Sequence, residues 1–140
     1  MSNHECMMNE YLYSYNDLSK HSALNGIKSV KISTRIETLQ RLNKARSYMD
    51  ECFLQNPTMN EVARYGNMSS FHFFRSFKQA FGITPYKYLL HKRLEHSKTL
   101  LTQKIPATET AKLCGFADIF TYSKAFKKAY GIPPSKFFIS

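Results

Sequence analysis

Two short stretches, at 71–85 and 120–134, carry the side chains best suited to chemistry in this 140-residue sequence. In the first, FHFFRSFKQAFGITP, the planar guanidinium of Arg75 can donate two hydrogen bonds to O6 and N7 of a guanine base. In the second, FTYSKAFKKAYGIPP, Lys124 stands at the matching place, and its point charge binds phosphate as readily as a base edge. Exposed aromatic rings beside these cations can pack on thymine methyl groups. Both stretches are therefore candidate nucleic-acid-binding surfaces.

The three cysteines do not form a catalytic or metal-binding arrangement. Cys6, Cys52 and Cys114 are far apart and lack paired spacing, and His4 beside Cys6 is not enough to complete a zinc site. A DNA-repair methyl acceptor fused to a binding module would need a zinc-bound thiolate, and Cys6, the one cysteine outside the predicted helices, lacks that cluster. We therefore expect no metal, no cofactor and no enzymatic activity.

The net charge, the lack of long apolar stretches and the unpaired cysteines indicate which partners and which cell compartment to expect. Twenty Lys and Arg against ten Asp and Glu give a formal net charge of +10, which favours a polyanion such as nucleic acid over an anionic membrane surface. No stretch approaches the roughly 18 consecutive apolar residues of a membrane span, and the amino terminus lacks a signal-peptide pattern. Unpaired cysteines are typical of a reducing compartment. We expect a cytoplasmic protein with no membrane partner.

The elements that hold the two stretches are predicted to be helices throughout. Residues 1–34 are rich in Ser, Asn and Tyr without helical periodicity, so we expect a poorly ordered tail or the remnant of a linker. Thr34 and Glu37 have the spacing of a capping box, which predicts a first helix at about 35–54. No segment has a convincing strand pattern, so the predicted fold class is all-α.

A short helix, a tight turn and a longer helix follow, and this unit occurs twice. We predict helices at about 58–65 and 70–81, and again at about 106–114 and 119–130, with the second turn one residue longer. Between the units, a connecting helix of roughly 25 Å starts at Pro85. Its expected apolar stripe consists of Tyr86, Leu89, Leu90, Leu94, Ser97, Leu100 and Leu101. Such pairs are typical of helix-turn-helix modules, whose second helix enters the DNA major groove.

This order of motifs resembles the AraC/XylS family of bacterial transcription regulators. The resemblance covers about residues 37–138 and is carried by NEVARYGNMSSFHFFRSFKQAFGITPYKYLLHKRLEHSKTLL and ETAKLCGFADIFTYSKAFKKAYGIPPSKF. It implies a homeodomain-like fold of about seven helices, with two helix-turn-helix modules joined by a linker helix. The expected DNA-binding domain spans 35–140, with a first module at about 35–83, the linker helix at about 84–103 and a second module at about 104–138.

The resemblance also implies a function. It indicates a sequence-specific activator of transcription that binds double-stranded promoter DNA beside RNA polymerase, with recognition helices in successive major grooves. Such a protein can act on DNA as a monomer and is associated with the nucleoid when bound. Two alternatives stay open: the DNA-binding fragment of a longer ligand-sensing regulator, and a basic protein that binds nucleic acid without sequence preference.

The expected DNA contacts are the positions left on the open faces of the two recognition helices. Phe73 and Phe77, four apart, are expected to be buried, as are Tyr122 and Phe126. The expected base-reading residues are Ser70, Phe71, Phe74, Arg75, Ile119, Phe120, Ser123 and Lys124. The expected phosphate-binding residues are Lys78, Lys127 and Lys128. For Phe71 and Phe74, burial in the core is an equally open alternative.

A few positions depart from the residues usual in the family. Asn67 replaces a turn glycine, a mild change because asparagine also tolerates the left-handed backbone. Ser97 replaces an alanine of the linker helix, and Ala107 and Thr110 are smaller than the usual aliphatic residues. A smaller apolar face loses about 25 cal/mol per Å² of burial. We therefore expect the second module to be the less stable half.

Overall fold

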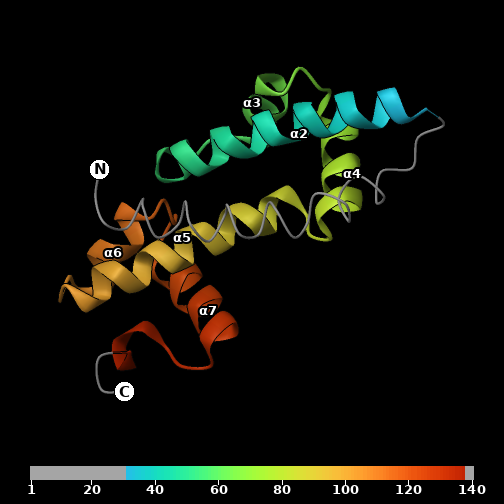
Figure 1. Ribbon diagram of the computed structural model, residues 1–140. Helices are drawn as coiled ribbons and strands as arrows, with labels where there is room; N and C mark the ends of the chain where they lie inside the picture. Colours follow the sequence, from blue (N-terminus) through green and yellow to red (C-terminus); the bar gives the residue numbers. More distant parts are fainter. Residues whose placement is uncertain (1–30, 138–140) are drawn as a thin grey trace.

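The computed structural model describes residues 31–137, and every regular element among them is helical. In chain order these elements are α2 (Ile32–Cys52), η1 (Phe53–Gln55), α3 (Met59–Tyr65), α4 (Ser70–Phe81), α5 (Pro85–Thr102), α6 (Ala107–Leu113), α7 (Ile119–Tyr130) and η2 (Pro134–Lys136), where η marks a short 3-10 helix (Figure 1). The predicted all-α fold class is confirmed. Within these residues, six α-helices and two 3-10 helices stand where about seven helices were expected.

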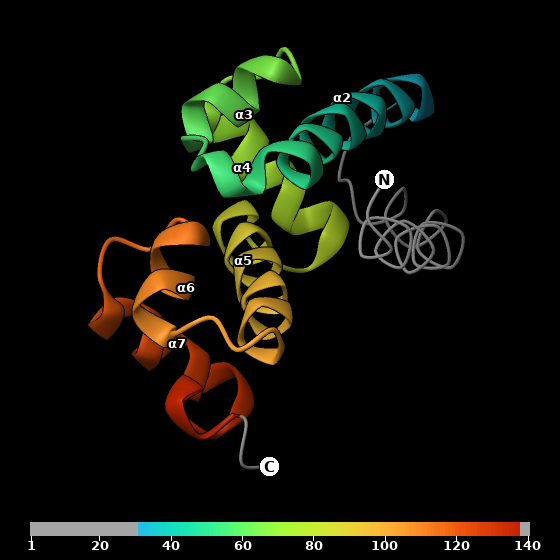
Figure 2. The ribbon, with the colours of Figure 1, turned by 90° about the vertical axis from the view of Figure 1, so that its left-hand side faces the viewer.

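The long helix α5 lies between two groups of helices. In both views α2 and α3 lie above it, whereas α6 lies beside it and α7 lies below α6 (Figures 1 and 2). Helix α2 packs on α3 and α4, whereas α6 packs on α5 and α7. The first group and the second group, each with a short helix followed by a twelve-residue helix, are called the first and second modules below.

The first helix begins earlier than predicted. Helix α2 starts at Ile32 with Lys31 as the capping residue and no side-chain cap, so the proposed capping box of Thr34 and Glu37 is wrong. The Glu37 carboxylate instead accepts a hydrogen bond from Arg41 Nη2 at 2.8 Å, one turn further along the helix. Residues 32–34 therefore belong to the first helix, and the rest of the predicted tail, apart from Lys31, lies outside the described residues.

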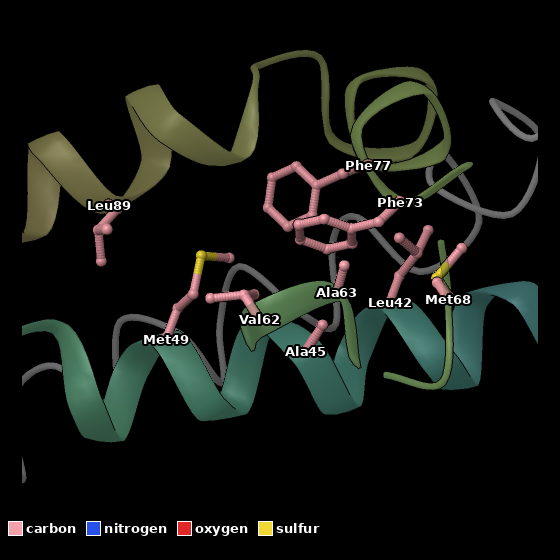
Figure 3. Packing of buried hydrophobic residues seen from close by; sticks show 9 residues of the cluster. All are labelled: Leu42, Ala45, Met49, Val62, Ala63, Met68, Phe73, Phe77 and Leu89. Carbon is pink, nitrogen blue, oxygen red and sulfur yellow. The ribbon is translucent and has the colours of Figure 1, made fainter. Parts of the chain in front are cut away.

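The core of the first module fills the space between α2, α3, α4 and the start of α5 (Figure 3). Its buried apolar members are Leu42, Ala45, Met49, Val62, Ala63, Met68, Phe73, Phe77 and Leu89. Figure 3 shows Phe73 and Phe77 pointing from α4 toward Ala63 and the facing side of α2. The predicted burial of these two rings is confirmed, and each is at most 1% exposed.

The core of the second module is smaller. Its buried apolar cluster consists of Leu94, Leu101, Ala111, Tyr122 and Phe126. Thr110 is also fully buried, and its hydroxyl donates to the Ile105 carbonyl at 3.3 Å. The described residues thus give the second module five buried apolar side chains in its cluster against nine in the first. This difference supports the prediction that the second module is less stable.

The two modules repeat the same aromatic packing. The twelve-residue helices α4 and α7 each carry three aromatic residues four positions apart, here called the aromatic ladder of that helix. The ladders are Phe73, Phe77 and Phe81 in α4, and Tyr122, Phe126 and Tyr130 in α7. Neighbouring ring centroids are 5.6 and 4.7 Å apart in α4 and 5.7 and 4.7 Å apart in α7, all edge-on. This repetition fixes how each helix sits in its module, because edge-on rings have a preferred geometry.

The two tight turns also use one design. Asn67 at φ 55° in the first turn and Gly115 at φ 83° in the second take the left-handed conformation that ends a helix. The N–H of Met68 donates to the Ala63 carbonyl, and the N–H of Phe116 donates to the Ala111 carbonyl, both at 3.0 Å. The predicted role of Asn67 as a stand-in for glycine is confirmed.

Helix α5 has the predicted length and most of the predicted buried stripe. Its first turn is capped by Thr84, whose hydroxyl accepts a hydrogen bond from the Lys87 N–H at 3.2 Å. The buried stripe positions are Leu89, Leu94, Ser97 and Leu101. Tyr86 was expected in this stripe, and that expectation is wrong because its side chain is 58% exposed. A tyrosine tolerates an exposed position because its hydroxyl can hydrogen-bond with water.

Candidate nucleic-acid interface

The two recognition helices, α4 and α7, start and end in the same way. The Ser69 hydroxyl accepts a hydrogen bond from the His72 N–H at 3.2 Å, and the Asp118 carboxylate accepts one from the Thr121 N–H at 2.7 Å. The latter bond holds the pKa of Asp118 below its ordinary value. Both helices end at a left-handed glycine, at φ 79° in α4 and φ 81° in α7. The two helices can therefore be compared position by position.

An exposed phenylalanine stands in the first turn of each recognition helix. Phe71 is 76% exposed and Phe120, at the matching position, is 81% exposed. Phe74, one turn after Phe71, is 42% exposed, whereas its counterpart Ser123 is half-buried. The alternative that Phe71 belongs to the core is wrong. Two large apolar rings at matched and open positions are unusual on a solvated surface, so these rings are candidates for contact with a partner.

Cations follow these rings on the same open faces. Arg75 and Lys124 lie four residues after Phe71 and Phe120, and both are exposed. Within residues 31–137 the ion pairs are Glu37–Arg41, Asp50–Lys92 and Glu95–Lys98, none of which involves a recognition helix. Neither recognition helix contains an Asp or Glu. The positive charge of both faces is therefore unpaired within the described part of the chain and available to an anionic partner.

Three lysines extend this charge to the carboxyl-terminal halves of the helices. Lys78 in α4 and Lys127 and Lys128 in α7 are all exposed, as expected for groups that contact phosphates. Their positive charge also suits the negative end of the helix dipole. These lysines form none of the ion pairs described above within residues 31–137, so they can both contact phosphates and stabilise the ends of their helices.

Two of the predicted base-reading side chains are less accessible than their neighbours, and a third is hydrogen-bonded within the protein. Ile119 and Ser123 are half-buried, and Ile119 packs against the second core. The Ser70 hydroxyl is exposed but donates a hydrogen bond to the amide oxygen of Asn60 in α3. Sequence reasoning missed Asn60, because the bond joins residues on either side of the turn and no local motif signals it. Asn60 is exposed beside Ser70 and belongs to the same face.

The thiols of the described residues do not form a second kind of site. Cys114 is fully buried, and burial raises the pKa of its thiol to about 11, so it stays protonated at neutral pH. Cys52 is half-buried, and Cys6 lies outside the described residues. Residues 31–137 contain no group of three or more potential metal ligands, and no helix among them is long and apolar enough to cross a bilayer.

Two helix-turn-helix units on one connecting helix, each with an open cationic face, define a class of DNA-binding domain. The pattern of the helix-turn-helix domain family matches residues 62–139. The C-terminal domain of AraT, a response regulator from Geobacillus stearothermophilus, has 31% identity and a TM-score of 0.64, covering 69% of this chain and 82% of that one. An AraC-type regulator from Chromobacterium violaceum has 28% identity and a TM-score of 0.64, covering 69% and 88%. The chain belongs to the AraC-type helix-turn-helix family.

Curated relatives are similar over the same region. The probable transcriptional regulator LumQ of Photobacterium leiognathi is 30% identical over 88 residues, or 61% of this chain and 36% of LumQ. The transcriptional activator RhaS of Klebsiella pneumoniae is 34% identical over 79 residues, or 56% of this chain and 28% of RhaS. The chain thus matches about a third of the length of these relatives. Their names are those of transcription regulators and not of enzymes, which agrees with the expectation from the sequence.

Proposed function

We propose that this protein regulates transcription by binding specific double-stranded promoter DNA through α4 and α7. One observation carries the proposal: both helices present the same open face, with an exposed ring in the first turn and an unpaired cation one turn later. A major groove offers apolar thymine methyl groups, guanine acceptors and flanking phosphates, which match these three kinds of side chain. Membership of the AraC-type family supports the same assignment.

In the first module, Arg75 is the main base-reading residue. Its exposed guanidinium has no ionic partner in residues 31–137, and a bidentate contact with guanine is worth about 1–3 kcal/mol of discrimination. Phe71 and Phe74 supply apolar contacts to thymine methyl groups, because both rings are exposed on the same helix. Ser70 reads a base edge through its lone pairs, since its own proton is directed to Asn60.

In the second module, Lys124 and Phe120 hold the matching places. Lysine lacks the planar fork of arginine, so we expect looser base reading here and a larger share of phosphate contacts. Ile119 and Ser123, being half-buried, contribute at the edge of this face. The lysines at the ends of both helices bind phosphates and fix the position of the protein along the duplex; these are Lys78, Lys127 and Lys128.

The proposed regulator binds an asymmetric site as a monomer and activates transcription. Recognition helices held about 34 Å apart enter successive major grooves on one face of B-DNA, and a misfit is relieved by bending the DNA. One chain carries both helices, so no second copy is needed for two contacts. Similarity to RhaS, which is named as an activator, supports activation. In this proposal the bound protein activates by contacting RNA polymerase at the promoter.

Selection of bound sequences from a random duplex pool, followed by titration at several salt concentrations, tests the proposal. Enrichment of two sequence blocks about one helical turn apart is the expected result. A single block would confine recognition to one module. If no sequence is enriched and affinity depends steeply on salt, the protein binds nucleic acid without sequence preference and the proposal is wrong.

Uracil substitution in the selected site tests the two exposed rings. Replacing thymine by uracil removes only the methyl group, which costs about 0.8 kcal/mol, or about fourfold in affinity, where a ring covers it. We expect this loss for the wild-type protein at the thymine that Phe71 contacts, and no loss for Phe71→Ala at the same position. The same comparison with Phe120→Ala serves the second block. Equal losses in wild-type and variant proteins would show that the rings do not contact the methyl groups.

A further inference from the structure

The two apolar cores on α5 do not merge. The first core ends on α5 at Leu89, and the buried cluster of the second begins at Leu94. Between them stand two nearly buried cations, Lys92 at 6% and Arg93 at 8% exposed. Apolar contact is non-directional, whereas hydrogen bonds to a planar guanidinium have a fixed geometry. The contact between the modules therefore has a polar component that can hold a defined angle.

The side chain of Arg93 is bound to the first module. Its Nη2 donates to the side-chain oxygen of Asn56 at 2.5 Å, and its Nε donates to the Phe53 carbonyl at 3.3 Å. Both acceptors lie in the segment between α2 and α3. Asn56 is held there by a left-handed backbone at φ 56°, immediately before Pro57. The segment between α2 and α3 is therefore hydrogen-bonded to the linker helix α5 through the guanidinium of Arg93.

The guanidinium of Arg93 also lies close to the second module. A Cβ atom added to Gly115 would lie 3.5 Å from Arg93 Nε, 3.7 Å from Arg93 Cζ and 3.9 Å from the Cβ of Asn56. Gly115 is the left-handed residue of the turn between α6 and α7. The guanidinium thus lies between the first module and the turn that leads into the second recognition helix. Phe53, Asn56, Arg93 and Gly115 are here called the Arg93 junction.

We propose that Arg93 is a positioning residue that sets the relative orientation of α4 and α7, and thereby the spacing of the two sequence blocks that the protein prefers. This inference rests on the proposed DNA-binding function. The junction joins the loop before α3 to the turn before α7, so a change in it rotates one recognition helix relative to the other about α5. Neither open face contains a junction residue, and base preference within each block is therefore a separate property.

Lys92 provides a matched control. Its ammonium lies 2.8 Å from Asp50 of α2, and Asp50 also accepts a hydrogen bond from the Tyr88 hydroxyl at 2.6 Å. These contacts join α5 to the first module alone. The ammonium also lies 5.9 Å from the centroid of the Phe53 ring, but Arg93 binds the carbonyl of Phe53 and not its ring. Lys92→Met therefore removes a buried cation next to Arg93 while leaving both hydrogen bonds of the junction in place, and should change stability but not spacing.

The experiment uses the full chain and the two-block site selected from the duplex pool. Affinities are measured for that site and for versions with one or two base pairs added or removed between the blocks. The wild-type protein should prefer one spacing by about tenfold or more, because a misplaced block must be reached by distorting the DNA. Arg93→Lys keeps the positive charge but lacks the planar guanidinium that bonds to both Asn56 and Phe53, and should reduce that preference to about threefold or less. Binding to a single isolated block should be unchanged.

Asn56→Ala removes the acceptor from the first module and gives a second test that leaves Arg93 intact. Circular dichroism shows whether each variant is folded, and only folded variants are compared. Spacing preference retained in both folded variants would overturn the inference, as would an equal loss in Lys92→Met. A wild-type site with one block, or with no preferred spacing, would overturn it as well. Failure to enrich any sequence would instead refute the proposed function.

Discussion

Substitution of Gly66 by alanine tests how the first helix-turn-helix turn is attached to α2. A Cβ atom at this position would lie 2.7 Å from the backbone oxygen of Arg41 and 3.2 Å from the Cβ of Ala45. Cβ atoms in proteins essentially never come within 3.0 Å of another heavy atom, so the turn and α2 would have to move apart. The backbone of Gly66, at φ −85° and ψ 6°, suits alanine, and the cost is therefore steric.

The expected size of this effect follows from two opposing terms. Overpacking against a rigid backbone atom costs about 1–3 kcal/mol. The smaller conformational freedom of alanine in the unfolded chain offsets about 0.4–1 kcal/mol. We therefore expect Gly66→Ala to lower the free energy of unfolding of the first module by about 1–2 kcal/mol.

Urea denaturation followed by circular dichroism measures this loss, and Gly82 supplies the control. A Cβ atom at Gly82 would meet nothing within 4 Å, but its φ of 79° is unfavourable for alanine. Asparagine tolerates that conformation, so Gly82→Asn should be milder than Gly82→Ala, whereas Gly66→Asn should be at least as harmful as Gly66→Ala. A Gly66→Ala protein that unfolds at the wild-type urea concentration would refute the reasoning.

Three further outcomes are expected. Arg75→Ala should relax base preference in one block by about 1–3 kcal/mol, and an unchanged block preference would remove Arg75 as a base reader. Lys127→Ala should instead weaken binding to all sequences alike. It should also reduce the slope of log affinity against log salt concentration by about one. Hydrogen exchange should be faster in α6 and α7 than in α3 and α4, because the second core is smaller, and the opposite order would contradict this. Although burial alone would raise the pKa of Glu95, hydrogen bonds from Tyr130 and Lys98 hold it below its ordinary value of 4.5. The contribution of these hydrogen bonds to stability is present above pH 4.5 and is lost as pH falls through the lower pKa of Glu95 in the folded protein. The stability difference between wild type and Glu95→Gln should therefore shrink in acid. A difference that stays constant with pH would show that these hydrogen bonds contribute nothing to stability.

Features that depend on neighbouring residues were predictable from the sequence. The capping box of Thr58 and Glu61 is present, with both hydrogen bonds made, because all its atoms lie within one turn of helix. The burial of Phe73, Phe77, Tyr122 and Phe126 was predictable from spacing alone, since residues four apart share a helix face. The turn at Asn67 was predictable because few residue types tolerate its backbone.

Features that depend on distant residues were not predictable. Arg93 meets Asn56 across 37 positions and Phe53 across 40, and no periodicity in a single sequence signals such a pairing. The bond from Ser70 to Asn60 crosses the tight turn for the same reason. At Thr34 the local signal was present, but α2 starts two residues earlier, at Ile32, and has no side-chain cap. The sequence was enough to predict which residues lie on the open faces, because helical periodicity fixes them once the buried positions are known. The DNA contacts of these residues remain predictions.

The aromatic ladders and the open faces occupy different positions of α4 and α7, so mutations at the two sets of positions have different effects. In both helices the ladder rings pack with nearly the same spacings, and the exposed residues of the open face take no part in these ring contacts. Phe71 and Phe120 protrude from helices that are buried in the same way, although the remaining open-face residues differ. A mutation on an open face therefore needs no compensating change in the core. Such a protein can acquire a new target site in evolution, one half at a time, while its fold stays constant.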